Sequence, residues 1–275
     1  MKISPLDWLH VVRNTIDYPL RQLFRWRRRG YVIQNENKDG LFSDLPAEQR
    51  LAAWQQVQGK VTRYRLEPLY LNSSVELFLK NLYYLDMLEK GLADHAAQWG
   101  QVLQAADIGA SDWFYAPALT AFLRQAGTIT RARQVRLEGY ETDAYRVYAD
   151  FYSRYDHTMA HINGLDEVTY VPQAFQAKPD RYQVVTQFFP FVFAHDHLQW
   201  GLPGGLFHPE AVLQAAWNSL APGGMLLIVN QGEEEHQAQS SMMRAAGMVV
   251  EKAARVESIY YRYDIPHFLL TAQKP

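Results

Sequence analysis

The segment Val102–Ala118, VLQAADIGASDWFYAPA, has the pattern of a buried strand followed by a tight turn and a helix. Its first seven residues are mostly apolar, which is typical of a strand covered on both faces of a sheet. Gly109, Ala110 and Ser111 are small enough for the backbone to turn sharply and to approach a ligand closely. Pro117 favours the start of a helix, whose free N–H groups can face an anionic group.

Two common glycine motifs do not fit this turn. The dinucleotide-binding pattern GxGxxG fails because Ser111 and Phe114 stand at its second and third glycines. The nucleophile-elbow pattern GxSxG fails because Trp113 replaces its last glycine. On this segment alone, a plain structural crossover explains the turn equally well.

Composition narrows the class of protein. The chain has 275 residues, 48% of them hydrophobic, which is enough for one large domain or for a domain with an appendage. A net charge of −2 argues against a general nucleic-acid binder. The absence of cysteine excludes disulfides, thiolate metal sites and cysteine nucleophiles. A cytoplasmic location is expected, because no apolar run approaches the roughly 20 residues of a membrane span and no signal-peptide pattern is present.

Residues 1–98 are predicted to form an all-helical region. Its first 30 residues carry seven Lys and Arg, Lys2 among them, against two Asp, and Pro19 is expected to separate two helices. This basic stretch indicates either an anionic partner, such as a membrane surface, or a solvated helix face. Further along, Ser73 and Glu76 have the spacing of a capping box, and Gly91 is expected to end that helix.

From residue 99 onward, strand-like and helix-like segments alternate, which predicts βαβ units and a mostly parallel sheet. After the first strand, further strands are expected over residues 134–140, 168–171, 182–188 and 225–230. A closing strand pair is expected within 248–256 and 259–271, and an aromatic helix over 143–159. The chain thus divides into a helical region, 1–98, and an α/β domain, 99–275.

This order of elements resembles the class I S-adenosylmethionine-dependent methyltransferase family over roughly residues 98–275. The sequence ADIGAS is similar to the family's D-x-G-x-G signature, with Asp107 and Gly109 in place and Ser111 at the second glycine. The sequence GYETD is similar to the end of the second strand, where an acidic residue accepts hydrogen bonds from both ribose hydroxyls, a role that falls on Glu141. The sequence LAPGGMLLIVN is similar to the turn into the fifth strand. The resemblance implies a Rossmann-like, mostly parallel seven-stranded sheet with helices on both faces.

The resemblance also assigns a set of residues near the ends of the first four strands to S-adenosylmethionine. These are Asp107, Gly109, Ala110, Ser111, Glu141, Gln173, Ala174, Thr186 and Gln187. Gln173 stands where the family often has an acidic residue that accepts a bond from the adenine amino group. Trp113 departs from the pattern, because it replaces the third loop glycine and is able to close part of the cofactor entrance.

The implied activity is methyl transfer from S-adenosylmethionine to an oxygen or nitrogen of a small molecule or a peptide. His197, in the segment FAHDHLQWGLP, is the first candidate for a base, since a neutral imidazole is abundant at pH 7. No metal site is expected from His195, His197 and His208, because no partner carboxylate is identifiable. DNA is not an expected partner, since the Asn/Asp-Pro-Pro-aromatic motif of DNA amino-methylating enzymes is absent.

Two other classes of function stay open. A non-catalytic scaffold that kept the fold would explain the departures at Ser111 and Trp113. A nicotinamide-dependent oxidoreductase shares the architecture but lacks its glycine pattern here. The helical region before residue 98 is expected to cover the substrate side as a lid, with the polar segment Asn35–Ser43 as its mobile part.

Overall fold

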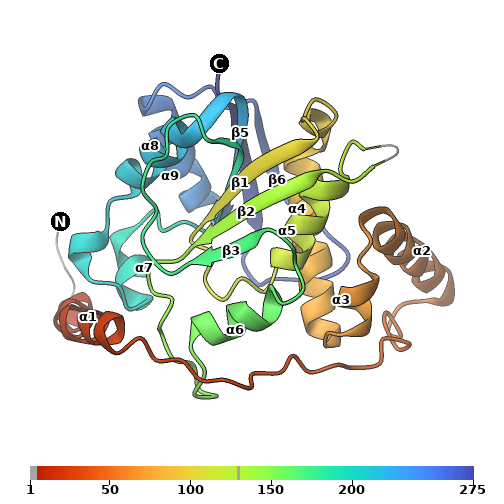
Figure 1. The fold of residues 1–275 in the computed structure, drawn as a ribbon, viewed down its shortest axis with the longest axis horizontal. Helices are drawn as coiled ribbons and strands as arrows, with labels where there is room; N and C mark the ends of the chain where they lie inside the picture. Colours follow the sequence, from red (N-terminus) through yellow and green to blue (C-terminus); the bar gives the residue numbers. More distant parts are fainter. Residues whose placement is uncertain (1–4, 129–130) are drawn as a thin grey trace.

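The computed structural model describes residues 5–128 and 131–275, so Lys2 lies outside the described residues. These residues form a seven-stranded sheet in the order β3-β2-β1-β4-β5-β7-β6 (Figure 1). Neighbouring strands are parallel up to β5, whereas β7 runs antiparallel to β5 and to β6. The strands are β1 Val102–Ile108, β2 Gln134–Tyr140, β3 Val168–Val171, β4 Tyr182–Phe188, β5 Leu220–Gln231, β6 Lys252–Arg255 and β7 His267–Gln273. The first four strands cover the residues predicted from sequence, and the predicted fold class is confirmed.

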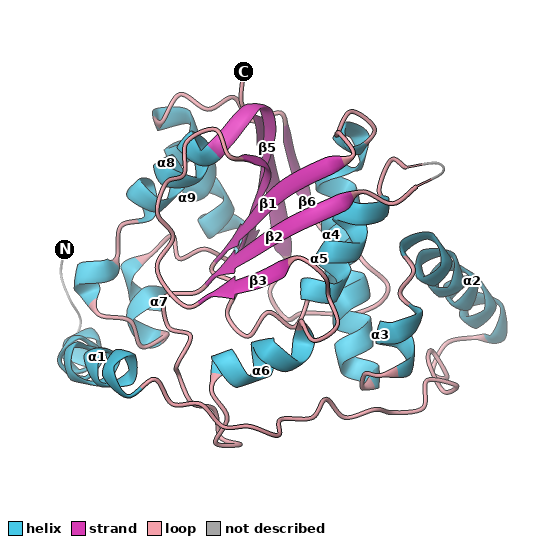
Figure 2. Ribbon diagram, viewed as in Figure 1, coloured by secondary structure: helices cyan, strands magenta, loops and turns pink. Residues whose placement is uncertain are grey.

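Helices cover both faces of the sheet (Figure 2). The helices are α1 Pro5–Phe24, α2 Ala47–Tyr64, α3 Glu67–Leu71, α4 Val75–Ala96, α5 Ala116–Gln125, α6 Arg154–His161, α7 Ala194–Gln199, α8 Pro209–Ser219 and α9 Gly232–Ala245, with a short 3-10 helix η1 Gly204–Leu206. Successive residues of β1 point to opposite faces, because side chains alternate along a strand. Leu103 and Ala105 join the core on one face, and Ala106 and Ile108 the core on the other. Both faces of the central strands are therefore filled, which leaves their ends for a ligand.

Two expectations for α4 are wrong. The residue that caps the helix is Ser74 rather than Ser73, since its side chain accepts a hydrogen bond from the N–H of Leu77. The helix also continues past Gly91 to Ala96. A Cβ at Gly91 would lie 2.7 Å from a methyl carbon of Leu227 on β5. This glycine therefore allows the helix to approach the sheet closely and does not end it.

The expected break at Pro19 is also absent, because α1 is continuous from Pro5 to Phe24. Its inner side is held by hydrogen bonds on both sides of the proline. Asn14 donates to two main-chain oxygens of the segment that contains α7, and Gln22 donates to the oxygen of Thr142. We attribute the continuity to these contacts, which compensate for the N–H that proline lacks.

The aromatic helix expected over residues 143–159 is wrong for most of its length. Residues 141–153 form a loop, and α6 begins only at Arg154, where Ser153 and Asp156 make a capping box. Within the loop, the N–H of Tyr148 donates to the oxygen of Tyr152, so that backbone groups are paired without a helix. This loop places polar side chains beside the end of β2.

Candidate functional site

Asp107 lies at the buried centre of the sheet's carboxyl edge. It is the residue of β1 that faces Gly139 on β2 and Thr186 on β4. The hydroxyl of Tyr115 donates to Oδ2 at 2.7 Å, and the hydroxyl of Thr186 donates to Oδ1 at 2.6 Å. Burial disfavours the ionised carboxylate and raises its pKa to about 6, although these hydrogen bonds oppose the shift. Asp107 therefore anchors the start of the loop from below and has no exposed surface.

The loop after β1 turns through three residues with positive φ. These are Gly109 at 83°, Ser111 at 54° and Trp113 at 49°. The N–H groups of Gly109 and Ala110 both donate to the oxygen of Tyr140, which holds the loop against the end of β2. A side chain other than glycine is strained in this region, and such strain clusters at functional sites. Gly109 is exposed, and a Cβ built there would meet nothing within 4 Å.

Glu141 follows β2 directly and is turned inward. Its Oε2 accepts a hydrogen bond from the N–H of Ser111 at 2.9 Å, and its Oε1 accepts one from the N–H of Asp143 at 2.7 Å. Arg154 lies 3.5 Å from the same Oε1. Only 6% of Glu141 is exposed, so the carboxylate predicted to bind ribose is engaged with its own chain.

The side chain of Trp113 is turned into the protein core. Its indole is fully buried and packs over Gly139 on β2, where a Cβ would lie 2.5 Å from the ring. Tyr170 on β3 lies beside the same indole, with ring centroids 6.2 Å apart. The bulky residue at the third loop position thus lies within the core beneath the loop.

Arginines surround the carboxylates at this edge. Arg21 of α1 makes a bidentate ion pair with the buried Asp143, at 2.9 and 3.0 Å. Arg154 is 1% exposed, and within the described residues its Nε and Nη1 have no hydrogen-bond partner. Its guanidinium lies 4.5 Å from the ring centroid of Trp200. A buried arginine with free donors leaves hydrogen-bonding capacity beside Glu141.

The other predicted cofactor residues divide into two groups. Gln173 and Ala174 are exposed directly after β3, on the same sheet edge as Glu141. Thr186 and Gln187 are buried within β4, where Thr186 is occupied by Asp107. The structure therefore brings the loop residues and Glu141 together, whereas Thr186 supports the site from below.

His197 lies on α7 and is 4% exposed. Its Nε2 lies 3.0 Å from the oxygen of Pro203, and since a carbonyl only accepts, this nitrogen carries the proton. The rings of Phe191 and Phe207 pack against the imidazole. Burial lowers its pKa below the ordinary value. The role of His197 as a base stays a prediction.

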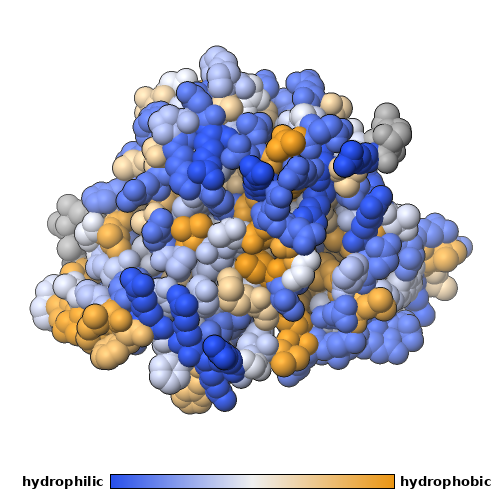
Figure 3. Space-filling model, in the orientation of Figure 1, coloured by the Kyte–Doolittle hydropathy of each residue, from blue (hydrophilic) through white to orange (hydrophobic). Residues whose placement is uncertain are grey.

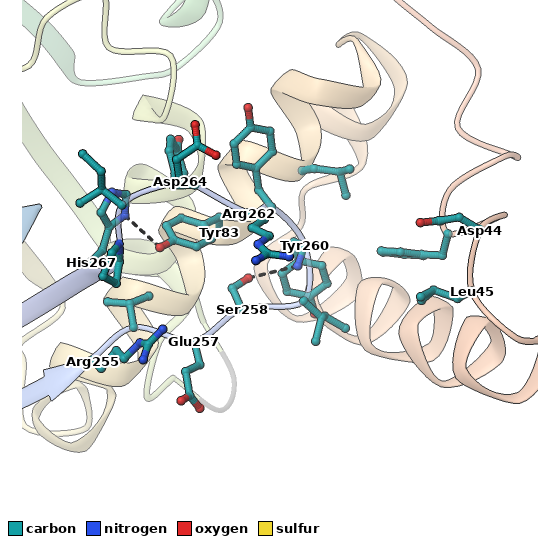
Figure 4. Close-up of a pocket in the computed structure, with 18 residues that line it drawn as sticks. Asp44, Leu45, Tyr83, Arg255, Glu257, Ser258, Tyr260, Arg262, Asp264 and His267 are labelled. Atoms are coloured by element: carbon teal, nitrogen blue, oxygen red, sulfur yellow. Dashed lines mark hydrogen bonds between the residues drawn. The ribbon is translucent and has the colours of Figure 1, made fainter. Parts of the chain in front are cut away.

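A cavity of about 860 Å³ that sequence reasoning missed lies between α4 and the segment that joins β6 to β7 (Figure 4). His267, at the start of β7, pairs with Gln231 at the end of β5. Its Nδ1 lies 2.9 Å from the hydroxyl of Tyr83. Phe189, directly after β4, packs on the imidazole at 4.4 Å between ring centroids. The cavity therefore adjoins the carboxyl ends of β4 and β5. No short motif marks it, because its walls come from distant segments.

The fit of S-adenosylmethionine follows from these contacts. The exposed backbone at Gly109 has free space, and it lies where the strand order reverses between β1 and β4, which is the usual ligand crevice of such sheets. Arg154 offers unused donors nearby. Glu141 has lone pairs left after two hydrogen bonds, but a ribose must displace or share the N–H of Ser111 to reach them. The loop after β1 thus fits S-adenosylmethionine as it stands. Glu141 fits the ribose only after its hydrogen bond with the N–H of Ser111 is displaced or shared.

Comparisons with known proteins find no match by sequence and several solved structures of low sequence identity. No known protein family and no curated protein matches the chain by sequence. Among solved structures, a methyltransferase from Aquifex aeolicus is 15% identical over 72% of this chain and 97% of its own, with a TM-score of 0.45. A class I methyltransferase structure from Listeria monocytogenes is 11% identical over 71% of this chain and 59% of its own, with a TM-score of 0.49. The cyclase SpnF is 14% identical over 67% of this chain and 80% of its own, with a TM-score of 0.45.

The strand order defines a doubly wound α/β protein, in which β7 is antiparallel to both of its neighbours, β5 and β6. This is the Rossmann-like, mostly parallel seven-stranded sheet that the resemblance to the class I S-adenosylmethionine-dependent methyltransferases implied. In residues 5–128 and 131–275, no helix is long and apolar enough to cross a membrane. The same residues contain no group of three His, Cys, Asp or Glu placed to hold a metal ion.

The raised pKa of Asp107 predicts how stability depends on pH. An aspartate in the unfolded chain titrates near about 3.9, so its ionisation in the fold costs stability as the pH rises from about 4 through the folded value of about 6. Asp107→Asn removes this cost while keeping a hydrogen-bond acceptor. We expect the free energy of unfolding of the variant to exceed that of the wild type by up to about 3 kcal/mol at pH 7.5, and this difference to disappear near pH 4.

Urea unfolding of both proteins from pH 4 to pH 8 measures this difference. His161 and His267, whose pKa values burial lowers to about 4, destabilise the fold in acid, but they do so in both proteins and cancel. An advantage of the variant that did not change with pH would contradict the prediction.

Proposed function

We propose that this protein transfers a methyl group from S-adenosylmethionine to an oxygen or nitrogen of a small molecule or a peptide. The observation that carries the proposal is the exposed, unobstructed backbone of Gly109 at the crevice between β1 and β4. Glu141 and Gln173 follow β2 and β3 at the same edge and supply acceptors for the sugar and the base. When bound, S-adenosylmethionine supplies an electrophilic methyl group on a sulfonium.

The residues of this chain contribute by positioning. Asp107 fixes the loop through Tyr115 and Thr186, so that the backbone at Gly109 keeps its turn. Methyl transfer is an in-line displacement, for which alignment of the acceptor supplies most of the help. The cavity lined by Tyr83 and His267 adjoins the same edge and is our candidate for the acceptor site. Its walls combine aromatic rings with charged side chains, among them Arg255 and Asp264, which suits an acceptor that has both apolar and polar groups.

The helical region before residue 98 is expected from the sequence to cover the substrate side, but the contacts of α1 lead us to propose that this helix covers the cofactor side instead. Arg21 and Gln22 of α1 contact Asp143 and Thr142, which directly follow Glu141. Loosening of the contacts with Thr142, while Arg21 stays paired with Asp143, would let Glu141 turn outward. Part of residues 1–98 then acts as a lid.

A non-catalytic scaffold is the second candidate. The two N–H groups already bound to Glu141, together with the indole of Trp113 beneath the loop, favour it, since they stabilise the site without a ligand.

Calorimetry with S-adenosylhomocysteine separates the two. We expect binding to the wild type and a loss of about 2 kcal/mol, roughly 30-fold, for Glu141→Gln, because hydrogen bonds to a charged acceptor are lost. Glu167→Gln, an exposed carboxylate near β3, serves as the matched control. Hydrogen exchange on the same samples should show added protection around Gly109 and in α1. Absence of heat at millimolar ligand would establish the scaffold instead, and exchange changes confined to residues 99–275 would rule out the lid.

A further inference from the structure

Helix α1 is attached to the rest of the protein through its polar side. The side chains that point inward make hydrogen bonds or ion pairs with residues 142–143 and 198–202, and they are Asn14, Tyr18, Arg21 and Gln22. Surface helices of globular proteins usually bury the apolar side and expose the polar one. The orientation of α1 is therefore inverted.

The outward side of α1 is apolar from Trp8 to Phe24. Its members are between 42% and 74% exposed, and they are Trp8, Leu9, Val12, Ile16, Leu20, Leu23 and Phe24. At 100° per residue, Leu9, Val12, Ile16, Leu20 and Leu23 share one stripe. Figure 3 shows this outer face of α1 as an orange patch at the edge of the molecule. Contiguous exposed apolar surface of this kind marks an interaction site.

Rotation of α1 does not relieve this exposure. Turning the stripe inward would place the guanidinium of Arg21 in solvent and leave the buried carboxylate of Asp143 without its bidentate partner. It would also break both bonds from the buried Asn14. The polar contacts therefore fix the stripe outward.

Positive charge accompanies the stripe. Arg13 lies along its edge, and four arginines, Arg25, Arg27, Arg28 and Arg29, follow directly after the helix, all exposed. Trp26 among them is 51% exposed. In the described part of this segment, Asp17 is the one acidic residue between Trp8 and Val32. A second copy of this chain would bring the same positive charge to the stripe, whereas an anionic lipid surface matches both its charge and its apolar face.

We propose that α1 docks on the surface of an anionic phospholipid bilayer. The apolar stripe enters the boundary between headgroups and acyl chains, and the arginines contact the lipid phosphates. The helix lies in the plane of the surface, as amphipathic anchors do, and the polar contacts of its inner side keep it joined to the protein. This inference does not depend on the proposed function.

Vesicle co-sedimentation of the full chain tests the proposal. We expect binding to vesicles of phosphatidylcholine with phosphatidylglycerol, weak binding to phosphatidylcholine alone, and release by high salt. Ile16→Ser/Leu23→Ser should lower the partition coefficient at least about tenfold. Arg13→Gln/Arg29→Gln should lower it roughly 25-fold, at about fivefold for each arginine.

Matched variants elsewhere on the surface serve as controls. Leu51→Ser/Val249→Ser removes comparably exposed apolar side chains, and Arg136→Gln/Arg262→Gln removes two exposed charges. Both should bind vesicles as the wild type does, and all variants should keep the wild-type melting temperature. Equal losses in the controls, or binding that does not require phosphatidylglycerol, would overturn the proposal. A dimer that Ile16→Ser/Leu23→Ser dissociates, with no vesicle binding, would make the stripe a self-interface instead.

Discussion

Replacement of Arg154 by methionine is expected to lower the free energy of unfolding by about 3 to 5 kcal/mol. Arg154 is 1% exposed and lies 3.5 Å from Glu141 and 3.9 Å from Asp143. Its removal leaves Glu141 as a buried carboxylate without a cation nearby, and an uncompensated buried charge is far more costly than a lost surface pair. Methionine keeps the contact with Trp200 and so isolates the effect of charge.

The double variant Arg154→Met/Glu141→Gln provides the control. Because it removes the carboxylate charge together with the guanidinium, we expect it to regain a large share of the lost stability. Urea unfolding followed by circular dichroism at pH 7.5 measures Arg154→Met, Glu141→Gln and the double variant, which together complete the cycle. If Arg154→Met cost under about 1 kcal/mol, or if the second substitution only added to the loss, the buried charge network would not hold this edge together.

Trp113→Ala is expected to have an effect of similar size, a loss of about 3 to 5 kcal/mol. The indole is fully buried, fills the space over Gly139 and contacts the ring of Tyr170. Its truncation leaves a cavity beneath the cofactor loop, and the surrounding strands cannot close over it without breaking their pairing.

A second substitution at the same position separates the packing of Trp113 from its backbone strain. Trp113 has a φ of 49°, a conformation that glycine adopts freely and alanine does not. Trp113→Gly should therefore be about 1 kcal/mol more stable than Trp113→Ala, although it removes one more carbon. Denaturation midpoints of the two variants give the comparison. An alanine variant as stable as the wild type would show that the indole contributes no packing, and a glycine variant below alanine would exclude the strained turn.

Local sequence patterns were most informative where a segment depends little on its neighbours. The strands from Gln134 to Tyr140 and from Tyr182 to Phe188 are the predicted ones. The first alternates apolar and polar residues, and the second is rich in β-branched and aromatic residues, and both patterns are typical of strands. The apolar stripe of α4, with Phe78, Leu82 and Leu85, is buried as its spacing indicated. Pro209 begins α8 for a similarly local reason.

Patterns failed where long-range contacts determine the outcome. Pro19 does not break α1, because its inner side is held by residues at least 120 positions away in the chain. Gly91 does not end α4, because Leu227 needs the space that a side chain would fill. The segment expected as an aromatic helix is a loop, because its polar groups find partners in α1 and in the carboxylates of Glu141 and Asp143.

The sequence by itself determined the alternation of strands and helices and the small-residue turn after β1, since these depend on local spacing and backbone preference. Only the tertiary structure decided that Glu141 is turned inward, that the cavity beside His267 adjoins the ends of β4 and β5, and that α1 exposes its apolar side. The physical reason is that burial and charge pairing depend on which distant groups meet. The free energy of a carboxylate or an apolar stripe is set by those neighbours, and no local pattern records them.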